Sequence, residues 1–210
     1  MNRVAAPRIL LSASVPLPSR DRVYFETADV IAIRDAIRAL TIVILEEQAS
    51  LIFGGHPAIT PMIRLQIAQT GTRVGDRITI FQSRYFEAVF LEDNSAFERV
   101  ELVDAVPGDQ ETSLLNMRTA MMAGSFTSAF FIGGMDGVER EFEMFRHLHP
   151  GVPMFPIAST GAAAARLFNS DERFPRTYPQ LRDEISYLTL MRSLIAIPNL
   201  PPSGNIRGSQ

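Results

Sequence analysis

The chain of 210 residues contains no cysteine, no tryptophan and no lysine, so all 20 residues counted as Lys+Arg are arginine. Without cysteine there can be no thiol nucleophile, disulfide, zinc ribbon or iron–sulfur cluster. Without lysine there can be no Schiff-base enzyme and no GxxxxGK[ST] phosphate loop. Three histidines, His56, His147 and His149, leave little room for a metal site. The sequence therefore predicts neither a metal nor a cofactor, and any cationic contact to a ligand must be a guanidinium.

Strong charge and long apolar runs are absent as well. The formal net charge of −3 argues against a nucleic-acid partner, because polyanions are usually held by basic domains. No apolar run reaches the ~18 residues that a membrane span requires, so we expect no membrane partner. The short apolar stretch within residues 1–16 is interpreted as a first strand and not as a signal peptide. With nothing pointing to export, the cytoplasm is the expected location.

Short apolar runs alternate with segments of helical spacing along the chain. Continuous apolar strands that alternate with helices predict an α/β, Rossmann-like parallel sheet with helices on both faces. We expect one such domain over 1–197 and a disordered Pro/Gly/Ser-rich tail over 198–210. The expected strands are 8–12, 51–53, 77–82, 100–103, 128–132 and 152–157, and the main helices are 30–44, 58–69, 111–123, one beginning near 138, and 159–168.

Local signals predict where two of the helices begin. Thr27 is the expected N-cap of the helix that contains Val30 and Ile33. Pro179 fits the first position of a last helix, whose apolar face would contain Leu181, Ile185 and Leu188.

Three expected strands end in loops that contain glycine. They are Gly54-Gly55, Gly133-Gly134 followed by Met135 and Gly137, and Ser159-Thr160-Gly161. In an open parallel sheet ligands bind beyond the carboxyl ends of the strands, where glycine lets backbone approach a phosphate and a helix N-terminus offers free N–H groups. Each loop also has a simpler interpretation, as a tight turn or as an ordinary N-cap. Together the three loops predict a site for a phosphorylated ligand.

The helix after the second glycine pair carries a carboxylate in an unusual place. Val138, Glu141, Phe142 and Phe145 follow helical spacing, so Glu141 lies on or beside the apolar stripe. It is a candidate for holding ribose hydroxyls or for acid–base chemistry, or it forms a salt bridge with a core-facing arginine. Arg118, in the preceding helix, could hold a phosphate, pair with Glu141 or extend to solvent.

Further candidates lie at the same predicted edge. Ser12 and Ser14, at the end of the first strand, offer hydroxyl groups, and Ser83 and Arg84 follow the third strand. His56 lies between Gly55 and a proline, where it is either a ligand contact or a structural hydrogen-bonding group.

In this order along the chain, LSAS, FGGHPAITP, QSRYF, MR, FIGGMDGVEREF and STGAAA resemble stand-alone bacterial proteins of the SLOG superfamily. That superfamily includes the LOG phosphoribohydrolases (lysine-decarboxylase-like proteins), the Rossmann domain of DprA and the nucleotide-sensing regions of TRPM channels. The resemblance covers roughly residues 8–195, and FGGHPAITP together with FIGGMDGVEREF is its most specific part.

The LOG enzymes carry a PGGxGTxxE loop and an arginine on the helix before it. By this resemblance Gly133, Gly134 and Gly137 correspond to the glycines, Glu141 to the final acid and Arg118 to the arginine. The match lacks the proline, has one additional residue between the glycines, has valine in place of threonine, and has arginine where a second acid is usual. These departures weigh against hydrolysis more than against binding.

The resemblance implies a protein that binds or senses a nucleotide or an ADP-ribose-related ligand, in a bacterial conflict or signalling system. The alternative is a LOG-like phosphoribohydrolase that cleaves the N-glycosidic bond of a nucleoside monophosphate, with Arg118 and Glu141 as catalytic residues. Whether the protein is an enzyme stays open. A DprA-like nucleic-acid module is a third hypothesis, against which the net charge argues. Because relatives assemble, the resemblance also implies a homo-oligomer, a dimer or a tetramer.

Overall fold

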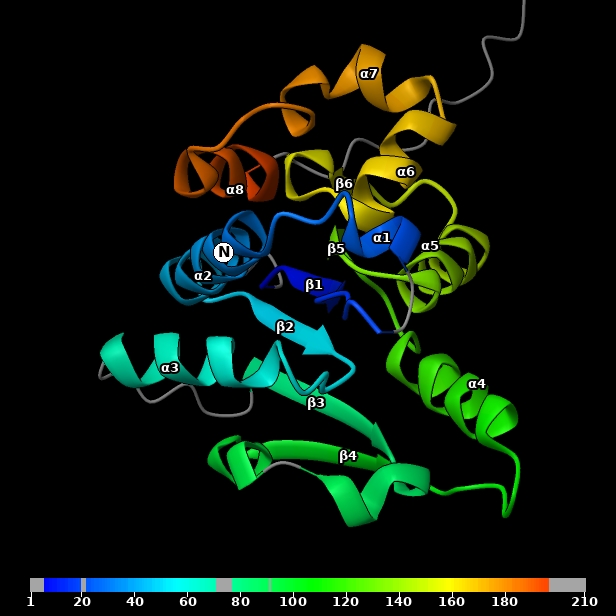
Figure 1. Ribbon diagram of the computed structural model, residues 1–210. Helices are drawn as coiled ribbons and strands as arrows, with labels where there is room; N and C mark the ends of the chain where they lie inside the picture. Colours follow the sequence, from blue (N-terminus) through cyan, green and yellow to red (C-terminus); the bar gives the residue numbers. More distant parts are fainter. Residues whose placement is uncertain (1–5, 20–21, 71–76, 91, 197–210) are drawn as a thin grey trace, which may run out of the picture.

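The computed structural model describes residues 6–19, 22–70, 77–90 and 92–196. Its centre is a six-stranded sheet, all of whose strand pairs are parallel, in the order β4-β3-β2-β1-β5-β6 (Figure 1). This confirms the predicted α/β, Rossmann-like fold. The strands are β1 (Arg8–Ser14), β2 (Ser50–Phe53), β3 (Ile78–Ser83), β4 (Arg99–Val103), β5 (Ser128–Gly133) and β6 (Met154–Ile157).

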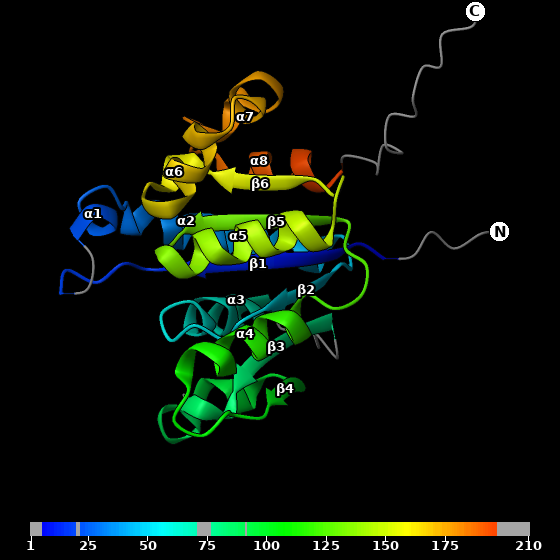
Figure 2. The same cartoon turned by 90° about the vertical axis from the view of Figure 1, so that its right-hand side faces the viewer.

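Helices cover both faces of this sheet, as Figure 2 shows. One layer contains α2 (Val30–Glu46), α3 (Thr60–Thr70) and α8 (Tyr187–Ile195), and the other contains α4 (Gln110–Met121) and α5 (Asp136–Leu148). Helix α6 (Ala162–Ser170) packs against β5, β6 and α5. The short elements are α1 (Arg22–Phe25), α7 (Arg173–Thr177) and the 3-10 helices η2 (Arg84–Val89), η3 (Glu92–Ala96), η4 (Ala158–Thr160) and η5 (Pro179–Leu181).

The apolar runs form strands because both faces of the inner strands are covered. Successive side chains of a strand point to opposite faces. Phe130 packs against its register partner Phe155 on β6, with ring centroids 5.1 Å apart. Its neighbour Phe131 packs against Phe142 of α5 at 5.0 Å. All six residues of β5 are buried, so this strand is the centre of the core.

The strand order defines the place where a ligand can enter. From β1 the chain adds β2, β3 and β4 on one side, then crosses to the other side of β1 to form β5 and β6. The two connections that leave β1 and β5 therefore diverge on opposite faces of the sheet. In open α/β sheets this divergence opens a crevice at the carboxyl ends of the two strands.

Two of the local expectations are wrong. The N-cap of α2 is Asp29, whose carboxylate accepts a hydrogen bond from Ala32 N at 2.9 Å, while the Thr27 hydroxyl donates to the carbonyls of Val23 and Tyr24. Pro179 begins only the short 3-10 helix η5, and the last helix begins eight residues later. Ile185, expected on its apolar face, is 74% exposed, because it lies in the irregular segment 184–186 that precedes α8.

None of the helices within the described ranges has the length and hydropathy needed to cross a bilayer. The expected tail over 198–210 lies outside the described residues.

Candidate functional site

A cavity of about 500 Å³ lies at the carboxyl ends of β1, β2 and β3, beside the loop that follows β5. Its floor is formed by the strand ends, one wall by α4 and the start of α5, and the opposite wall by 54–59 and 86–90. It lies next to the crevice that the strand order predicts between β1 and β5, on the side of β2 and β3. Sequence-predicted residues that line it are Ser14, Gly54, Gly55, His56, Ser83, Arg118, Met135, Gly137 and Glu141.

Helix α4 turns one face toward the cavity. Gln110, Leu114, Met117 and Arg118 line it, and their spacing of four, three and one residues places them along one side of the helix. Asp109 caps this helix, since its carboxylate accepts hydrogen bonds from Thr112 N at 3.0 Å and from Thr112 Oγ1 at 2.6 Å. These bonds hold the pKa of Asp109 below its usual value. The cap thus helps to position the wall that carries Arg118.

The most specific polar feature of the site joins three elements. Arg118 Nε lies 3.1 Å from Glu141 Oε1, and the Ser12 hydroxyl donates to Glu141 Oε2 at 2.6 Å. The side chains of Arg118 and Glu141 are only 12% and 14% exposed, and Ser12 is 1% exposed. The geometry is therefore compatible with both interpretations of Glu141, as a structural salt-bridge partner and as a ligand contact. It forms a salt bridge with Arg118, and both residues line the cavity.

The N-terminus of α5 supplies backbone donors. Its N-cap, Met135, makes no side-chain capping hydrogen bond, and the carbonyl of Met135 accepts from Val138 N and Glu139 N. The N–H groups of Asp136 and Gly137 have no acceptor within the helix, and both residues line the cavity. These groups and the positive end of the helix dipole favour an anion. The Asp136 side chain is 70% exposed and lies 3.9 Å from Arg140.

The cavity contains little positive charge. Among the described residues that line it, Arg118 is the single arginine, and Glu141 balances its charge. Most of the remaining lining is apolar, from Leu11, Ala13, Val15, Leu17, Phe53, Pro57, Ala58, Ile59, Phe86, Val89, Phe90, Leu114, Met117 and Val138. The site therefore combines a small polar side, at Arg118, Glu141 and the start of α5, with a wide apolar side. Ser12 does not line the cavity and reaches it only through its hydrogen bond to Glu141.

The second glycine pair makes room for packing. A Cβ on Gly133 would lie 2.4 Å from Ile33 Cδ1 of α2, and one on Gly134 would lie 2.4 Å from Val138 Cγ2 of α5. Neither glycine lines the cavity. Their small size therefore explains how both helices approach the end of β5, and a contact of these glycines with a ligand stays a prediction.

His56 has a structural role that does not exclude contact with a ligand. Its Nδ1 accepts a hydrogen bond from Ala58 N at 3.1 Å, and its carbonyl accepts from Thr60 N at 2.9 Å at the beginning of α3. Its half-buried ring also lines the cavity. Ser83 Oγ similarly accepts from Tyr85 N at 3.3 Å and so caps η2.

The third predicted loop lies away from the cavity. The Thr160 hydroxyl accepts from Gly133 N at 2.9 Å and donates to the carbonyl of Ile157 at 2.6 Å. Ser159 Oγ accepts from the Tyr187 hydroxyl at 3.0 Å, and burial raises the pKa of Tyr187. Gly161 packs against the backbone of Thr27. None of these three loop residues lines the cavity, so their proposed contact with ligand stays a prediction without a geometric argument.

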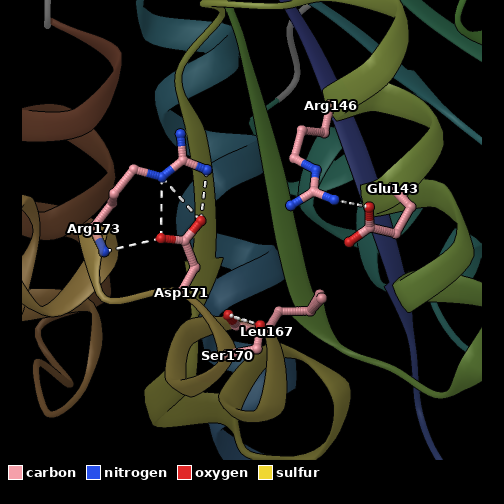
Figure 3. A network of polar contacts seen from close by, with 6 residues as sticks. All are labelled: Glu143, Arg146, Leu167, Ser170, Asp171 and Arg173. Atoms are coloured by element: carbon pink, nitrogen blue, oxygen red, sulfur yellow. Dashed lines mark hydrogen bonds and ion pairs between the residues drawn. The ribbon is translucent and has the colours of Figure 1, made fainter.

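Arg84 also lies outside the cavity lining and is engaged with exposed acids. It lies 2.9 Å from Glu87 and 3.4 Å from Asp104. Such local pairing is common in this molecule, as Figure 3 shows for Arg146 with Glu143 and for Arg173 with Asp171 at 2.9 Å. The Arg173 guanidinium lowers the pKa of Asp171. The pair of Arg118 with Glu141 differs because both of its members are largely buried.

Sequence reasoning missed the apolar wall and one buried amide, Gln82. The part of this apolar wall that α4 contributes could have been found in the sequence, because Leu114 and Met117 share the helical face of Arg118. The contribution of η2 had no such signal, because a 3-10 turn leaves no regular spacing. Across the described ranges no group of three or more His, Asp or Glu side chains is arranged to hold a metal ion.

A family model described as the SLOG cluster3 family matches residues 23–195, which is most of the chain. A search of curated proteins gives no match.

Proposed function

The chain belongs to the SLOG cluster3 family, and we propose that its cavity binds a nucleotide-like small molecule. The observation that carries this proposal is the two-sided cavity at the carboxyl ends of the strands. Its apolar wall suits a flat base, and its polar side suits a sugar phosphate. Pockets of this size that combine apolar walls with few polar groups are typical of small-molecule sites.

Each part of a nucleotide has a counterpart among the lining residues. A phosphate would accept hydrogen bonds from the N–H groups of Asp136 and Gly137 at the start of α5. Ribose hydroxyls would donate to Glu141, whose second oxygen is held by Ser12. Arg118 would give charge-assisted hydrogen bonds to the phosphate, or hold the Glu141 carboxylate in place through their ion pair. The base would pack against Phe53, Phe86 and other members of the apolar wall.

The charges further restrict the ligand. Arg118 is already balanced by Glu141, and Asp136 adds a carboxylate near the anion site. We therefore propose a ligand with one phosphate or a pyrophosphate, such as a nucleoside monophosphate or an ADP-ribose derivative. A triphosphate would bring more negative charge than a monophosphate into a cavity whose one described arginine is already paired, so we expect it to bind more weakly.

Isothermal titration of the purified protein with AMP, ADP-ribose, NAD and ATP tests this proposal. We expect at least one of the first three to bind below about millimolar, and ATP to bind more weakly than AMP. Failure of all four to bind would overturn the proposal. Tighter binding of ATP than of AMP would contradict the charge argument alone.

The geometry of Arg118, Glu141 and Ser12 supports a second candidate function, LOG-like hydrolysis of an N-glycosidic bond. A carboxylate beside the anomeric carbon could activate water or stabilise an oxocarbenium-like transition state. Release of free adenine from AMP, lost in Glu141→Gln, would establish this function. Binding of AMP with no release of adenine over hours would favour the sensor.

We also propose a homo-oligomer, a dimer or a tetramer. Light scattering coupled to size-exclusion chromatography would show it as a mass of two or four times 23.3 kDa.

A further inference from the structure

A buried side-chain amide is present within the apolar part of the cavity. Gln82, near the end of β3, is 8% exposed and lines the cavity together with Phe53, Ile59 and Phe86. Burying an amide among apolar groups costs free energy unless its hydrogen bonds are formed. Both polar atoms of the Gln82 side chain have partners within the protein.

Two hydrogen bonds determine how this amide is turned. Gln82 Nε2 donates to the carbonyl of Gly55 at 3.2 Å, and Gln82 Oε1 accepts from Asn94 Nδ2 at 2.8 Å. A carbonyl oxygen can only accept, so the nitrogen of Gln82 must face Gly55 and its oxygen must face Asn94. Asn94 must then present its NH₂ group. The orientation of both amides thus follows from one backbone carbonyl.

The arrangement has a cost that an apolar core would avoid. Asn94 is 6% exposed, and its Oδ1 is the one buried side-chain nitrogen or oxygen without a hydrogen-bond partner in the described part of the chain. An unsatisfied buried acceptor is destabilising, whereas two apolar side chains of similar shape would be nearly neutral. The benefit that can offset this cost is that Asn94 holds the Gln82 amide in one orientation.

The loop opposite is shaped to admit the amide. Gly55 has φ +55°, and a Cβ there would lie 2.6 Å from Gln82 Nε2 and 2.7 Å from Ile80 Cγ2. Glycine at this position therefore makes room for Gln82. It also allows the left-handed conformation of the turn.

After these two bonds, Gln82 keeps one hydrogen on Nε2 and one lone pair on Oε1. An adjacent donor and acceptor match the edge of a base that presents an amino group beside a ring nitrogen, as adenine does. We infer that Gln82 recognises this edge of the base, and that Asn94 is a positioning residue that holds Gln82 in the required orientation. This inference rests on the proposed function, because it names the base-recognising residue of the same cavity.

The test compares AMP with purine riboside 5′-monophosphate, which lacks only the exocyclic amino group. We expect the wild-type protein to bind AMP about tenfold more tightly in isothermal titration, since a site built for a hydrogen bond discriminates against a ligand that lacks it. The double variant Gln82→Leu/Asn94→Leu removes both amides together, so that only the Gly55 carbonyl loses its donor, and it should bind the two nucleotides equally. Asn94→Leu alone should reduce the ratio by loosening Gln82.

Gln110→Leu is the matched control, because Gln110 lines the same cavity from α4 and should leave the ratio unchanged. Thermal unfolding of each variant checks that it is folded. Equal binding of both nucleotides by the wild type would overturn the role of Gln82 while the proposed function stands. An unchanged ratio in the folded double variant would overturn it as well. If neither nucleotide binds the wild type below about millimolar, the proposed binding of nucleoside monophosphates fails, and the role of Gln82 fails with it.

Discussion

The segment 133–137 after β5 and the segment 159–161 after β6 contain similar sequence signals. Each contains glycine with positive φ, and each leads into a helix whose N-cap makes no side-chain capping hydrogen bond. After β6 the protein itself occupies the loop, because Asp29 N donates to the carbonyl of Thr160 and Gly161 packs against the backbone of Thr27. After β5, residues 135–137 face a cavity.

The difference lies in the segment that packs over each loop. Thr27 and Asp29, between β1 and α2, cover the start of α6. The start of α5 instead faces the cavity, which α4 lines from the same side. A glycine-containing loop before a helix is therefore a potential anion site that other parts of the chain can close.

Gly161→Ala has the largest expected effect, and it acts on stability. The new Cβ would lie 1.8 Å from Thr27 O. Gly161 has φ +72° and ψ −157°, a backbone conformation that residues other than glycine rarely adopt. Strain and overpacking together should destabilise the fold by about 3 to 5 kcal/mol. Chemical denaturation measures this loss. A loss below about 1 kcal/mol would contradict the view that this loop is closed by packing.

Breaking the Arg118–Glu141 pair should come second. Arg118→Met leaves a carboxylate that is only 14% exposed without its cation, which should cost about 2 kcal/mol after allowing for that exposure. Glu141→Gln should cost less, because Ser12 can still donate to the amide oxygen.

The double variant Arg118→Met/Glu141→Gln should recover part of the loss, as a double-mutant cycle by thermal unfolding would show. Strict additivity of the two losses would mean that the pair is not coupled. Both single variants should also weaken nucleotide binding about tenfold or more. Substitutions in the loop after β6 should leave nucleotide binding unchanged in the folded protein.

Gly137→Ala is the counterpart of Gly161→Ala on the open side. Its Cβ would lie 3.2 Å from Arg118 Nη2, so the guanidinium would need to shift only by a few tenths of an ångström, and stability should change by less than about 1 kcal/mol. The methyl group would nevertheless occupy the mouth of the anion site and should weaken AMP binding about tenfold. Unchanged affinity in this variant would argue that the phosphate is held elsewhere.

The smallest effect is expected at the N-cap of α4. Asp109→Ala removes the hydrogen bonds to Thr112 and should lower the Tm by a few degrees at neutral pH. The lowered pKa of Asp109 means that folding favours its carboxylate. That stabilisation is present above the ordinary Asp pKa of about 3.9 and is lost as the pH falls through the lowered value. The Tm difference from wild type should therefore shrink in acid, while Asp109→Asn should retain most of the cap.

The sequence alone determined the sheet and its helices, because continuous apolar strands and helical spacing survive any detail of packing. Helical periodicity also placed Glu141 at the border of the buried stripe, and a salt bridge with a core-facing arginine was one of its predicted roles. The sequence could not separate the loop after β5 from the loop after β6, because both contain the same local chemistry.

Tertiary structure decided which loop stays open, because Thr27 and Asp29 pack over Thr160 and Gly161, which lie far from them in the sequence. It also decided that Gln82 meets Asn94 and Gly55 beside the cavity. The absence of lysine and cysteine excluded several chemistries from the start. The placement of one largely buried arginine against one carboxylate depended on α4 and α5 lying on the same face of the sheet.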